Sequence, residues 1–531
     1  MHPRNDLTPE TIVRVTQLKD FYSELDQRME QIRAALPGLV AQVQDETLRK
    51  PLLRIQRLVC SQIDEDTIDR FAAYELTAVS PDDSADTGTA VSSDEKLALA
   101  LSGWLMGADN SVRNLNDVVS LFEAREKILD YLDTDVTEAA WRHQMLETIT
   151  GLEGVSIARV AAIVRHLPAF RPVQVEMSES SSRDHFRLEA TPESLRGTGL
   201  FPPEYHESRQ YPVLIALHGP FDTPETCLRL WQSAAEKNGF IVVAPDWLKK
   251  DEGGKVEASP DYYTSAEFHH MFRGLLHEVK QRLRVDDDRI FIAGHGFGGD
   301  MAMDVATSHS DTFAGIVSIC GTGHRHIQWT ASNAILMPWY VLIGDAQDSW
   351  FERMNMLSAK LFRRDDEMDI DFDTVFVKYP SRALEPYLEE MDSIFEWMSR
   401  YRRMRFPEKV YARILRSSDL NWSWVRLKGL PSQFAQLDRA VLGPTAAYRP
   451  AELNVRRDDS NLIRIKSAPA DVTLLLAPDM PGLDVNRPIR IHNGRRLTTV
   501  DYDPQIAHLL EELYRTGDRS RLCFMRVEVT K

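Results

Sequence analysis

The sequence has few cysteines and no long apolar run. Its four cysteines, Cys60, Cys227, Cys320 and Cys523, stand far apart and form no CxxC pair. This spacing argues against a zinc site or a redox dithiol and indicates reduced, mostly buried thiols. No stretch approaches the roughly 20 apolar residues of a membrane-spanning helix, and the N-terminus has no apolar run of a signal peptide. We therefore expect a cytoplasmic protein without a membrane partner.

The sequence also has fewer basic residues than acidic ones. The 531 residues include 63 lysines and arginines against 80 aspartates and glutamates, which gives a net charge of -17. A nucleic-acid partner is not expected, because phosphate backbones select basic surfaces. Charged residues at 27% and apolar residues at 43% are typical of a soluble globular protein. At this length, two or three domains are expected.

The pattern of the chain changes twice, which predicts three parts. Residues 1–170 carry apolar residues at spacings of three and four, as amphipathic helices do, with a polar, aromatic-free linker at about 80–94. Residues 172–405 alternate short apolar runs with helical stretches, which predicts a largely parallel sheet. Residues 406–531 carry short alternating runs, which predicts a small β-rich domain with one helix near Ile506–Tyr514.

Two smaller features carry expectations of their own. The apolar seam of the first helix, from Val15 to Leu36, is expected to stop at Pro37 and to pack against helices of the same chain rather than in a coiled coil. Arginines at positions 400, 402, 403 and 405 follow the last helix of the second part. Cations suit the C-terminal end of a helix, so a solvated helix end is favoured over a binding patch.

The central motif is Arg289–Ala306, RIFIAGHGFGGDMAMDVA, which predicts a buried strand, a glycine turn and a helix. Four of the six residues from Gly294 to Gly299 are glycine, so the backbone takes angles or makes approaches that a side chain forbids. The GxGxxG turn of dinucleotide-binding folds matches letter for letter. The GxSxG nucleophile elbow of α/β-hydrolases matches except that Gly296 stands at the serine position.

Neighbouring strands favour the elbow over the dinucleotide turn. A dinucleotide-binding fold expects a carboxylate about 20 residues on, at the end of the next strand, and that strand ends in Ser318-Ile319-Cys320-Gly321. The upstream strand ends in His218-Gly219, which in α/β-hydrolases leads into the oxyanion loop. Nucleotide binding through residues 294–299 stays a minor alternative.

The order of these segments resembles α/β-hydrolases of the esterase and prolyl-oligopeptidase-like type, and more closely large planctomycete-type esterases or peptidases. The resemblance rests on PPEYHESRQYPVLIALHG, AGHGFGGDMAMDVA and LAPDMPGLDVNRPIRIHNGR and extends over most of residues 135–531. It implies an α/β class fold, the doubly wound, mostly parallel sheet of α/β-hydrolases. A helical N-terminal region and a small β-rich C-terminal domain accompany that sheet in these relatives.

The resemblance also implies a catalytic site whose decisive side chains are replaced. Relatives have serine where this chain has Gly296, and histidine where it has Leu384 in the segment YPSRALEPY. Glycine has no atom to attack a carbonyl, and leucine cannot take or return a proton. The acid position falls on Asp345 or Asp348, of which we favour Asp348. Without a histidine to orient, it is expected to be a helix-capping loop residue.

The oxyanion loop and nearby histidines complete the candidate site. The loop supplies Gly219 and Pro220, and because proline has no N–H, only the N–H of Phe297 is expected to remain as a donor. Candidates for the pocket at the carboxyl ends of the strands are His218, His295, His324 and His326. No third ligand can be named beside His324 and His326, so no metal or cofactor is expected. No base is evident for the thiol of Cys320.

These patterns predict an α/β-hydrolase-fold protein that has lost Ser-His-Asp hydrolysis and binds an unidentified small molecule or protein. The alternative is an active carboxylesterase or peptidase-like hydrolase that uses an unrecognised nucleophile or a metal. Glycine at the elbow also removes backbone strain on the order of 1–3 kcal/mol. The oligomeric state does not follow from the sequence.

Overall fold

The computed structural model shows two compact units, Met1–Pro168 and Ala169–Lys531. The residues that it describes are 9–77, 91–135, 137–173, 185–219, 222–248, 263–323, 326–346, 357–438 and 448–531, with side chains of the first helix from Leu18 on. The linker predicted at about 80–94 lies mostly outside these residues. Among the described residues, no helix combines the length and the apolar character needed to cross a membrane.

The first unit is helical, as predicted. Its α-helices are α1 (Pro9–Gln42), α2 (Glu46–Ser61), α3 (Ala72–Glu75), α4 (Ser93–Met106), α5 (Leu115–Asp133), α6 (Ala139–Gly151) and α7 (Ile157–His166). α4 begins with a capping box, because the Ser92 side chain accepts from the N–H of Glu95 and the Glu95 carboxylate accepts from the N–H of Ser92. α7 ends just before Leu167 and Pro168, since a residue that precedes proline avoids helical angles.

The expectation that the first helix ends at Pro37 is wrong. Proline removes one backbone hydrogen bond from a helix interior, yet α1 continues through it. Leu36 and Val40, on either side, are both fully buried at 0% exposure, so the packing of this turn offsets the lost bond. The seam packs within the chain from Leu25 on, whereas Leu18 is 55% exposed.

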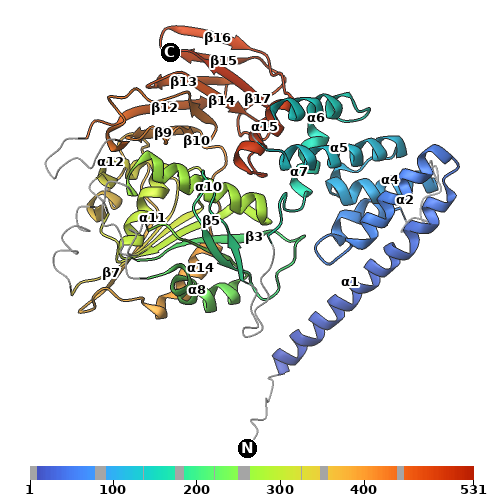
Figure 1. Cartoon of the computed structure of the whole chain (residues 1–531), viewed down its shortest axis with the longest axis horizontal. Coiled ribbons are helices and arrows are strands. Elements are labelled where there is room, and N and C mark those ends of the chain that lie inside the picture. The colour runs from blue at the N-terminus through green and yellow to red at the C-terminus, as the bar shows by residue number, and fades with distance from the viewer. Residues whose placement is uncertain are drawn as a thin grey trace, which may run out of the picture. The chain divides into compact units, whose positions relative to one another are not determined.

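The second unit is built around an eight-stranded sheet with the order β1-β2-β4-β3-β5-β6-β7-β8 (Figure 1). Its strands are β1 (His185–Leu188), β2 (Gly197–Leu200), β3 (Tyr211–Leu217), β4 (Ile241–Pro245), β5 (Val285–His295), β6 (Gly315–Ile319), β7 (Trp339–Gly344) and β8 (Thr374–Tyr379). β3 to β8 pair in parallel, and β1 and β2 add an antiparallel edge. The predicted α/β class is confirmed, although β1 and β2 were not predicted.

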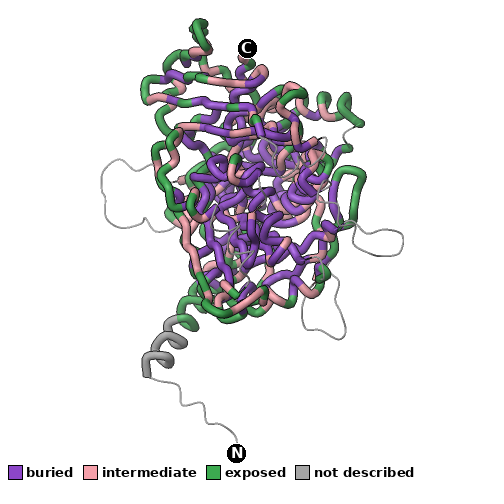
Figure 2. The backbone as a smooth tube through the Cα atoms, turned by 90° about the vertical axis from the view of Figure 1, so that its left-hand side faces the viewer, coloured by how far each residue is buried: buried purple, intermediate pink, exposed green. Residues whose placement is uncertain are grey.

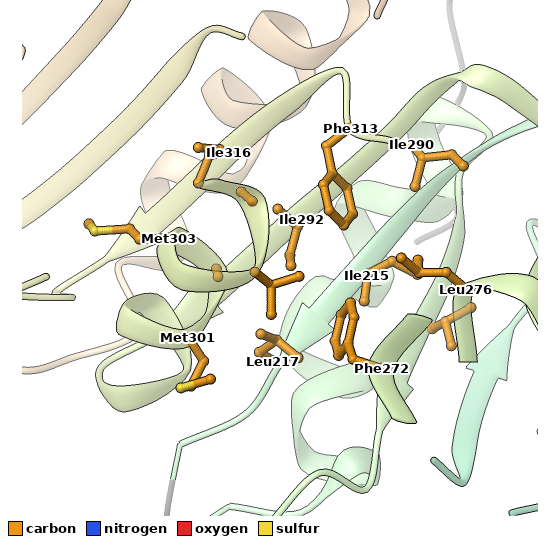
Figure 3. Close-up of a cluster of buried hydrophobic side chains, with 14 of the residues drawn as sticks. Ile215, Leu217, Phe272, Leu276, Ile290, Ile292, Met301, Met303, Phe313 and Ile316 are labelled. Atoms are coloured by element: carbon orange, nitrogen blue, oxygen red, sulfur yellow. The ribbon is translucent and has the colours of Figure 1, made fainter. Parts of the chain in front are cut away.

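Helices cover both faces of this sheet. α10 (Ala266–Arg282) and α11 (Phe297–Ser308) lie on one face, and α8 (Pro224–Asn238) and α14 (Met391–Ser399) on the other (Figure 1). Ile215 and Leu217 of β3 pack with Phe272 of α10 (Figure 3), whereas Leu214, between them, packs in the opposite cluster with Trp231 of α8. Successive side chains of a strand point to opposite faces, so the strands are buried on both (purple in Figure 2).

The rest of the second unit is β-rich. One sheet has the order β10-β11-β14-β17 and another β16-β15-β13-β12-β9. Their strands are β9 (Lys409–Ile414), β10 (Asn421–Trp422), β11 (Val425–Leu427), β12 (Ala451–Asp458), β13 (Leu462–Ser467), β14 (Val472–Leu476), β15 (Ile489–Asn493), β16 (Arg496–Val500) and β17 (Met525–Val529). The predicted helix is α15 (Ile506–Thr516), and Asn493-Gly494 turns between β15 and β16 as a hairpin. Both parts lie in one compact unit, so their division near residue 406 stays a prediction.

The arginines after α14 do not form a purely solvated helix end. Arg403 is buried, with Nη1 2.6 Å from Oδ2 of Asp518 and Nη2 3.0 Å from Oδ1 of Asp288. Arg402 does remain 62% exposed. The expectation failed at Arg403 because its partner Asp518 stands 115 residues further along the chain, where no local pattern connects the two.

Candidate functional site: a glycine elbow

The glycine turn at residues 294–299 connects β5 to α11 at the carboxyl edge of the central sheet. Gly296 is at its apex, with φ 57° and ψ -120°, a conformation that residues with side chains adopt only under strain. Its N–H donates to the carbonyl of Ile319 at the end of β6 (2.8 Å), and its carbonyl accepts from the N–H of Gly299 (2.9 Å). The apex is thus fixed between two strands and the first turn of a helix, as in a nucleophile elbow.

Close packing explains the glycines on either side of the apex. A Cβ on Gly294 would lie 2.0 Å from the carbonyl oxygen of Gly298, and one on Gly298 would lie 2.2 Å from that of Leu217. Both distances are far inside van der Waals contact. At Gly296 the nearest atom to an added Cβ is Cδ1 of Leu384 at 3.4 Å, an ordinary contact. Of these three positions, only the apex has room for a side chain.

The same packing weakens the dinucleotide alternative. The carbonyl oxygens of Leu217 and His218 lie 2.2 and 2.8 Å from the position of a Cβ on Gly298, near the N-terminus of α11. A phosphate needs N–H donors at such a helix end rather than carbonyl oxygens. The sheet order, with β3 between β4 and β5, also differs from the 3-2-1-4-5-6 order of dinucleotide-binding folds. The elbow interpretation of the turn is therefore favoured.

Leu384 lies directly beside the apex. Its two methyl carbons are 3.4 and 3.8 Å from the position of a Cβ on Gly296, and its side chain is 42% exposed. The structure thus brings together the two positions at which the resemblance expects the nucleophile and the histidine. An isobutyl group at the second position occupies space but offers no nitrogen to exchange a proton.

Polar contacts hold the loop that carries Leu384. Nε2 of His295 lies 3.0 Å from the carbonyl oxygen of Glu385, so this nitrogen donates. Arg382 makes two bonds of 2.8 Å to the Glu385 carboxylate, and its guanidinium lies 4.4 Å from the ring centre of Tyr387. The carbonyl of Arg382 also accepts from the N–H of Ala346 (2.9 Å), so backbone contacts on both sides of Leu384 hold it beside Gly296.

Residues 189–373 match the model of a protein family described as "Putative esterase". The matched segment contains β3 to β7, the elbow and α11. We call residues 189–373, which match this family model, the esterase-family segment; its parallel strands and flanking helices have the α/β-hydrolase fold.

The esterase-family segment is also similar to individual proteins. Over 143 residues the chain is 29% identical to the putative esterase NocK of Nocardia uniformis subsp. tsuyamanensis, and the match spans 26% of this chain and 37% of that relative's length. Similar solved structures include two hydrolases. One is an S-formylglutathione hydrolase from Agrobacterium tumefaciens, with 16% identity, TM-score 0.35 and coverage of 43% of this chain and 99% of that one. The other is a dienelactone hydrolase from Anabaena variabilis, with 14% identity, TM-score 0.33 and coverage of 42% and 100%.

Aromatic rings pack between the end of β3 and the first turn of α11, where the sequence predicts the oxyanion loop. His218 is buried, and its Nδ1 lies 2.9 Å from the carbonyl oxygen of Gly219. The ring centre of Trp247 lies 5.8 Å from that of His218 and 5.5 Å from that of Phe297. Pro220 lies outside the described residues. The wall beside the first turn of α11 is therefore largely apolar.

Of the two candidate acids, Asp345 is described and Asp348 lies outside the described residues. Oδ1 of Asp345 accepts from the N–H of Ser381 (2.6 Å), and Oδ2 lies 3.1 Å from Nζ of Lys378. The Ser381 N–H and the Lys378 ammonium hold the pKa of Asp345 below its usual value. Asp345 thus ties the end of β7 to the loop before Leu384.

Cys320 follows β6 at the same edge. It is buried with φ 55°, and its Sγ lies 3.9 Å from the carbonyl oxygen of Ala383. Burial raises the pKa of this thiol, so at neutral pH it is not the thiolate that acts as a nucleophile.

His326 belongs to a buried charge cluster rather than to the elbow, and His324 lies outside the described residues. At the centre of the cluster is Asp304 of α11, whose carboxylate accepts two bonds from Nη2 of Arg416, at 2.5 and 2.6 Å. Nε2 of His326 is 2.9 Å from the same carboxylate and Nε2 of His269 is 3.4 Å from it. Burial alone would raise the pKa of Asp304, but Arg416 and the two histidines hold it well below its usual value.

Three of the described residues are spaced as metal ligands would be. One ligand atom each of His269, His309 and Asp419 lies within 4.8 Å of the other two. The two imidazoles bond each other, with Nδ1 of His269 3.1 Å from Nε2 of His309, and Arg416 lies 3.3 Å from the Asp419 carboxylate. These contacts already use one ring nitrogen of each histidine and one carboxylate oxygen of Asp419, and a buried guanidinium repels a metal cation.

The apex gives a first testable prediction. Gly296→Ala is expected to lower the free energy of unfolding by about 1–3 kcal/mol, because alanine fits the space but must keep φ 57°. Urea unfolding of the full chain measures the loss. Gly429→Ala is the control, since an added Cβ there meets no atom within 4 Å. Equal stability of the two variants would contradict the prediction.

Proposed function

We propose that the second unit is an α/β-hydrolase-fold protein that binds a small molecule or a protein segment and does not hydrolyse it by the Ser-His-Asp route. The proposal rests on one observation: the elbow apex, Gly296, has no side chain, and the neighbouring Leu384 has an apolar one. Nucleophile and proton carrier act as a pair, so replacing both removes the covalent route.

Groups near the elbow that might replace this pair already have other contacts. His295 donates to the backbone carbonyl of Glu385, and Asp345 accepts from Ser381 and Lys378. The thiol of Cys320 has a raised pKa and contacts the Ala383 carbonyl. Each contact is one that a catalytic group would have to give up. They support binding over catalysis at this edge.

The lining of the edge indicates the character of the ligand. The rings of Trp247, Tyr263 and Phe297 lie within 5.6 Å of one another, measured between ring centres. Leu384, partly exposed, adds an aliphatic group next to Gly296. Trp247 and Tyr263 are buried, so the apolar surface beside Gly296 comes from the partly buried Phe297 and from Leu384, and such a surface suits apolar or aromatic groups. We therefore propose an uncharged, partly apolar ligand or a peptide segment with such a side chain.

Ester hydrolysis tests the proposal. The purified protein is expected to turn over a nitrophenyl butyrate ester no faster than the buffer blank and to resist labelling by a fluorophosphonate, which reacts with activated serines. Gly296→Ser alone is the matched control, because it restores a hydroxyl without a base and should remain unlabelled. The double variant Gly296→Ser, Leu384→His is expected to gain labelling, since both positions are adjacent.

Repeated turnover by the natural protein would overturn the proposal. It would favour the alternative, an active esterase that uses another nucleophile or a metal. Labelling followed by peptide mapping would then identify the nucleophile, and loss of turnover with a chelator would indicate a metal. If the natural protein neither hydrolyses the ester nor becomes labelled, and the double variant does become labelled, the binding role would be supported.

A further inference from the structure

Residues of α10, α15, β10 and β11 line a cavity that we call the α10 cavity. Its volume is about 90 Å³, which is room for several waters or one small ligand. Arg273, His277 and Lys280 reach it from positions i, i+4 and i+7 of α10, so they share one helix face. No residue of the elbow lines it.

Positive charge exceeds negative charge around this cavity. Its five cations are Arg273, Lys280, Arg426, Arg515 and Arg521, and its three carboxylates are Asp311, Glu512 and Asp518. Burial lowers the pKa of His277 to about 4 and that of His309 well below its usual value, so both histidines are neutral at pH 7. The lining therefore carries an excess of two positive charges.

One carboxylate is shared by several arginines at the α15 end of the cavity. Oε1 of Glu512 accepts from both Arg426 and Arg515, and Oε2 lies 3.3 Å from Nη2 of Arg526. Burial alone would raise the pKa of Glu512, but Arg515 and Arg426 lower it to about 2, so it is ionised. Glu511 also lies 3.6 Å from Arg526, so two carboxylates face three guanidinium groups and one positive charge remains.

Arg273 has no acidic partner among the described residues. Its single hydrogen bond goes from Nη1 to the carbonyl oxygen of Ser418 and is long, at 3.4 Å. Burial lowers the pKa of Arg273 and repulsion from Arg515 and Arg426 lowers it further, against a smaller attraction from Asp311 and Asp419, which lie beyond ion-pair distance. One turn along α10, Nδ1 of His277 is buried without a hydrogen-bond partner among the described residues. The lining thus places a ring nitrogen without a hydrogen-bond partner beside a guanidinium with one long bond, and a ligand with acceptor atoms would complete both.

We propose that the α10 cavity binds a small oxyanion, a phosphate group that is either free or carried by a small molecule, with Arg273 as its main ligand and Arg426 and Arg515 beside it. Guanidinium groups suit phosphate because their planar N–H donors match its oxygens in pairs. The excess of two positive charges matches a phosphate dianion. The proposal is independent of whether the elbow hydrolyses esters.

Calorimetric titration of the full chain with inorganic phosphate, at constant ionic strength, tests the site. Saturable binding is expected, and Arg273→Ala is expected to weaken it about tenfold or more, because a hydrogen bond to a charged group is lost. Arg282→Ala is the matched control. Arg282 is on the same helix, pairs with Glu278 (2.6 Å) and does not line the cavity, so its variant should bind phosphate as the natural protein does.

Two further readouts separate a ligand role from a structural one. By NMR, phosphate should raise the pKa of His277 in the natural protein, since a bound dianion favours the imidazolium, and should not do so in Arg273→Ala. Without phosphate, Arg273→Ala should be at least as stable as the natural protein, because cation repulsion is relieved. A clear loss of stability would instead show that Arg273 only tethers α10 to Ser418.

A competition experiment distinguishes a free phosphate ion from a phosphate ester as the ligand. Glycerol phosphate should displace inorganic phosphate if the site takes esters, and should fail to do so if the site takes only the free anion. Either result supports an oxyanion site. Absence of saturable phosphate binding by the natural protein, or equal binding by Arg273→Ala, would overturn the proposal.

Discussion

Arg416→Leu is expected to lower the free energy of unfolding of the second unit by about 3–5 kcal/mol, the cost of removing one partner from a buried ion pair. Arg416 is fully buried and binds both oxygens of Asp304, the hydroxyl of Ser308 (2.6 Å) and the carbonyl of Thr264 (2.5 Å). Its loss leaves the Asp304 carboxylate with two histidines and no permanent cation. Urea unfolding of the full chain measures the effect, and hydrogen exchange in α11 assigns it to this unit.

Two variants control this prediction. Arg413→Leu changes an arginine three residues earlier, which is only partly buried and bonds the Tyr411 hydroxyl (3.0 Å); its loss should cost no more than about 1 kcal/mol. Asp304→Asn in the Arg416→Leu background removes the uncompensated charge and should recover part of the stability. Equal losses for Arg416→Leu and Arg413→Leu would contradict the role assigned to the buried pair.

Acid pH should reduce the difference between Arg416→Leu and the natural protein. In the natural protein the pKa of Asp304 is lowered by folding, so its contribution is complete above the ordinary aspartate pKa and is lost as the pH falls through the folded value. In the variant, burial without Arg416 raises that pKa, so protonation relieves the penalty. Unfolding midpoints measured from pH 7 to pH 4 should therefore converge.

Gly298→Ala is expected to cost about 3 kcal/mol or more, at the upper end of the range for overpacking. An added Cβ would lie 2.2 Å from the carbonyl oxygen of Leu217 and 2.8 Å from that of His218, and both are backbone atoms of β3 and its end. Backbone cannot rotate away as a side chain can. α11 would have to move away from the sheet, which would expose apolar side chains such as Met301 (Figure 3).

The ranking of three glycine variants tests this packing. Gly298→Ala should unfold at the lowest urea concentration, Gly296→Ala at an intermediate one and Gly429→Ala nearest the natural protein. If the first does not accumulate as a folded protein, proteolysis of freshly refolded chains gives the same ranking. A Gly298→Ala variant as stable as Gly429→Ala would show that the close approach of α11 to β3 is not tight.

The sequence predicts the parallel strands well because each is an uninterrupted apolar run buried on both faces. It does not predict β2, whose sequence GTGL contains two glycines and is typical of a turn. The structure shows why a glycine is required there: a Cβ on Gly199 would lie 2.2 Å from the ring of Phe186 on β1. The glycine at position 199 is therefore explained by tertiary packing against Phe186, which the local sequence pattern does not reveal.

In the candidate site, too, the sequence predicts some contacts and misses others. The proximity of Gly296 and Leu384 was expected from a family resemblance and is present in the structure. The ion pairs of Arg416 with Asp304 and of Arg403 with Asp518 were not expected, because their members are 112 and 115 residues apart. Charged residues scattered along a sequence look like a solvated surface until the fold brings them together. Asp348, Pro220 and His324 stay predictions.

The buried ion pairs also determine when the central fold can be completed during synthesis. Asp518 forms ion pairs with Arg403 and Lys280. It is synthesised 115 residues after Arg403. At about 5–20 residues per second, this is a delay of roughly 6–23 s during which Arg403 has only Asp288, and Lys280 only Asp287, as its acidic partner in this cluster. The contacts of α10 and of the residues after α14 are therefore complete only when the C-terminal segment has been made, and a chain cut short before residue 518 should be cleaved by proteases faster than the full chain.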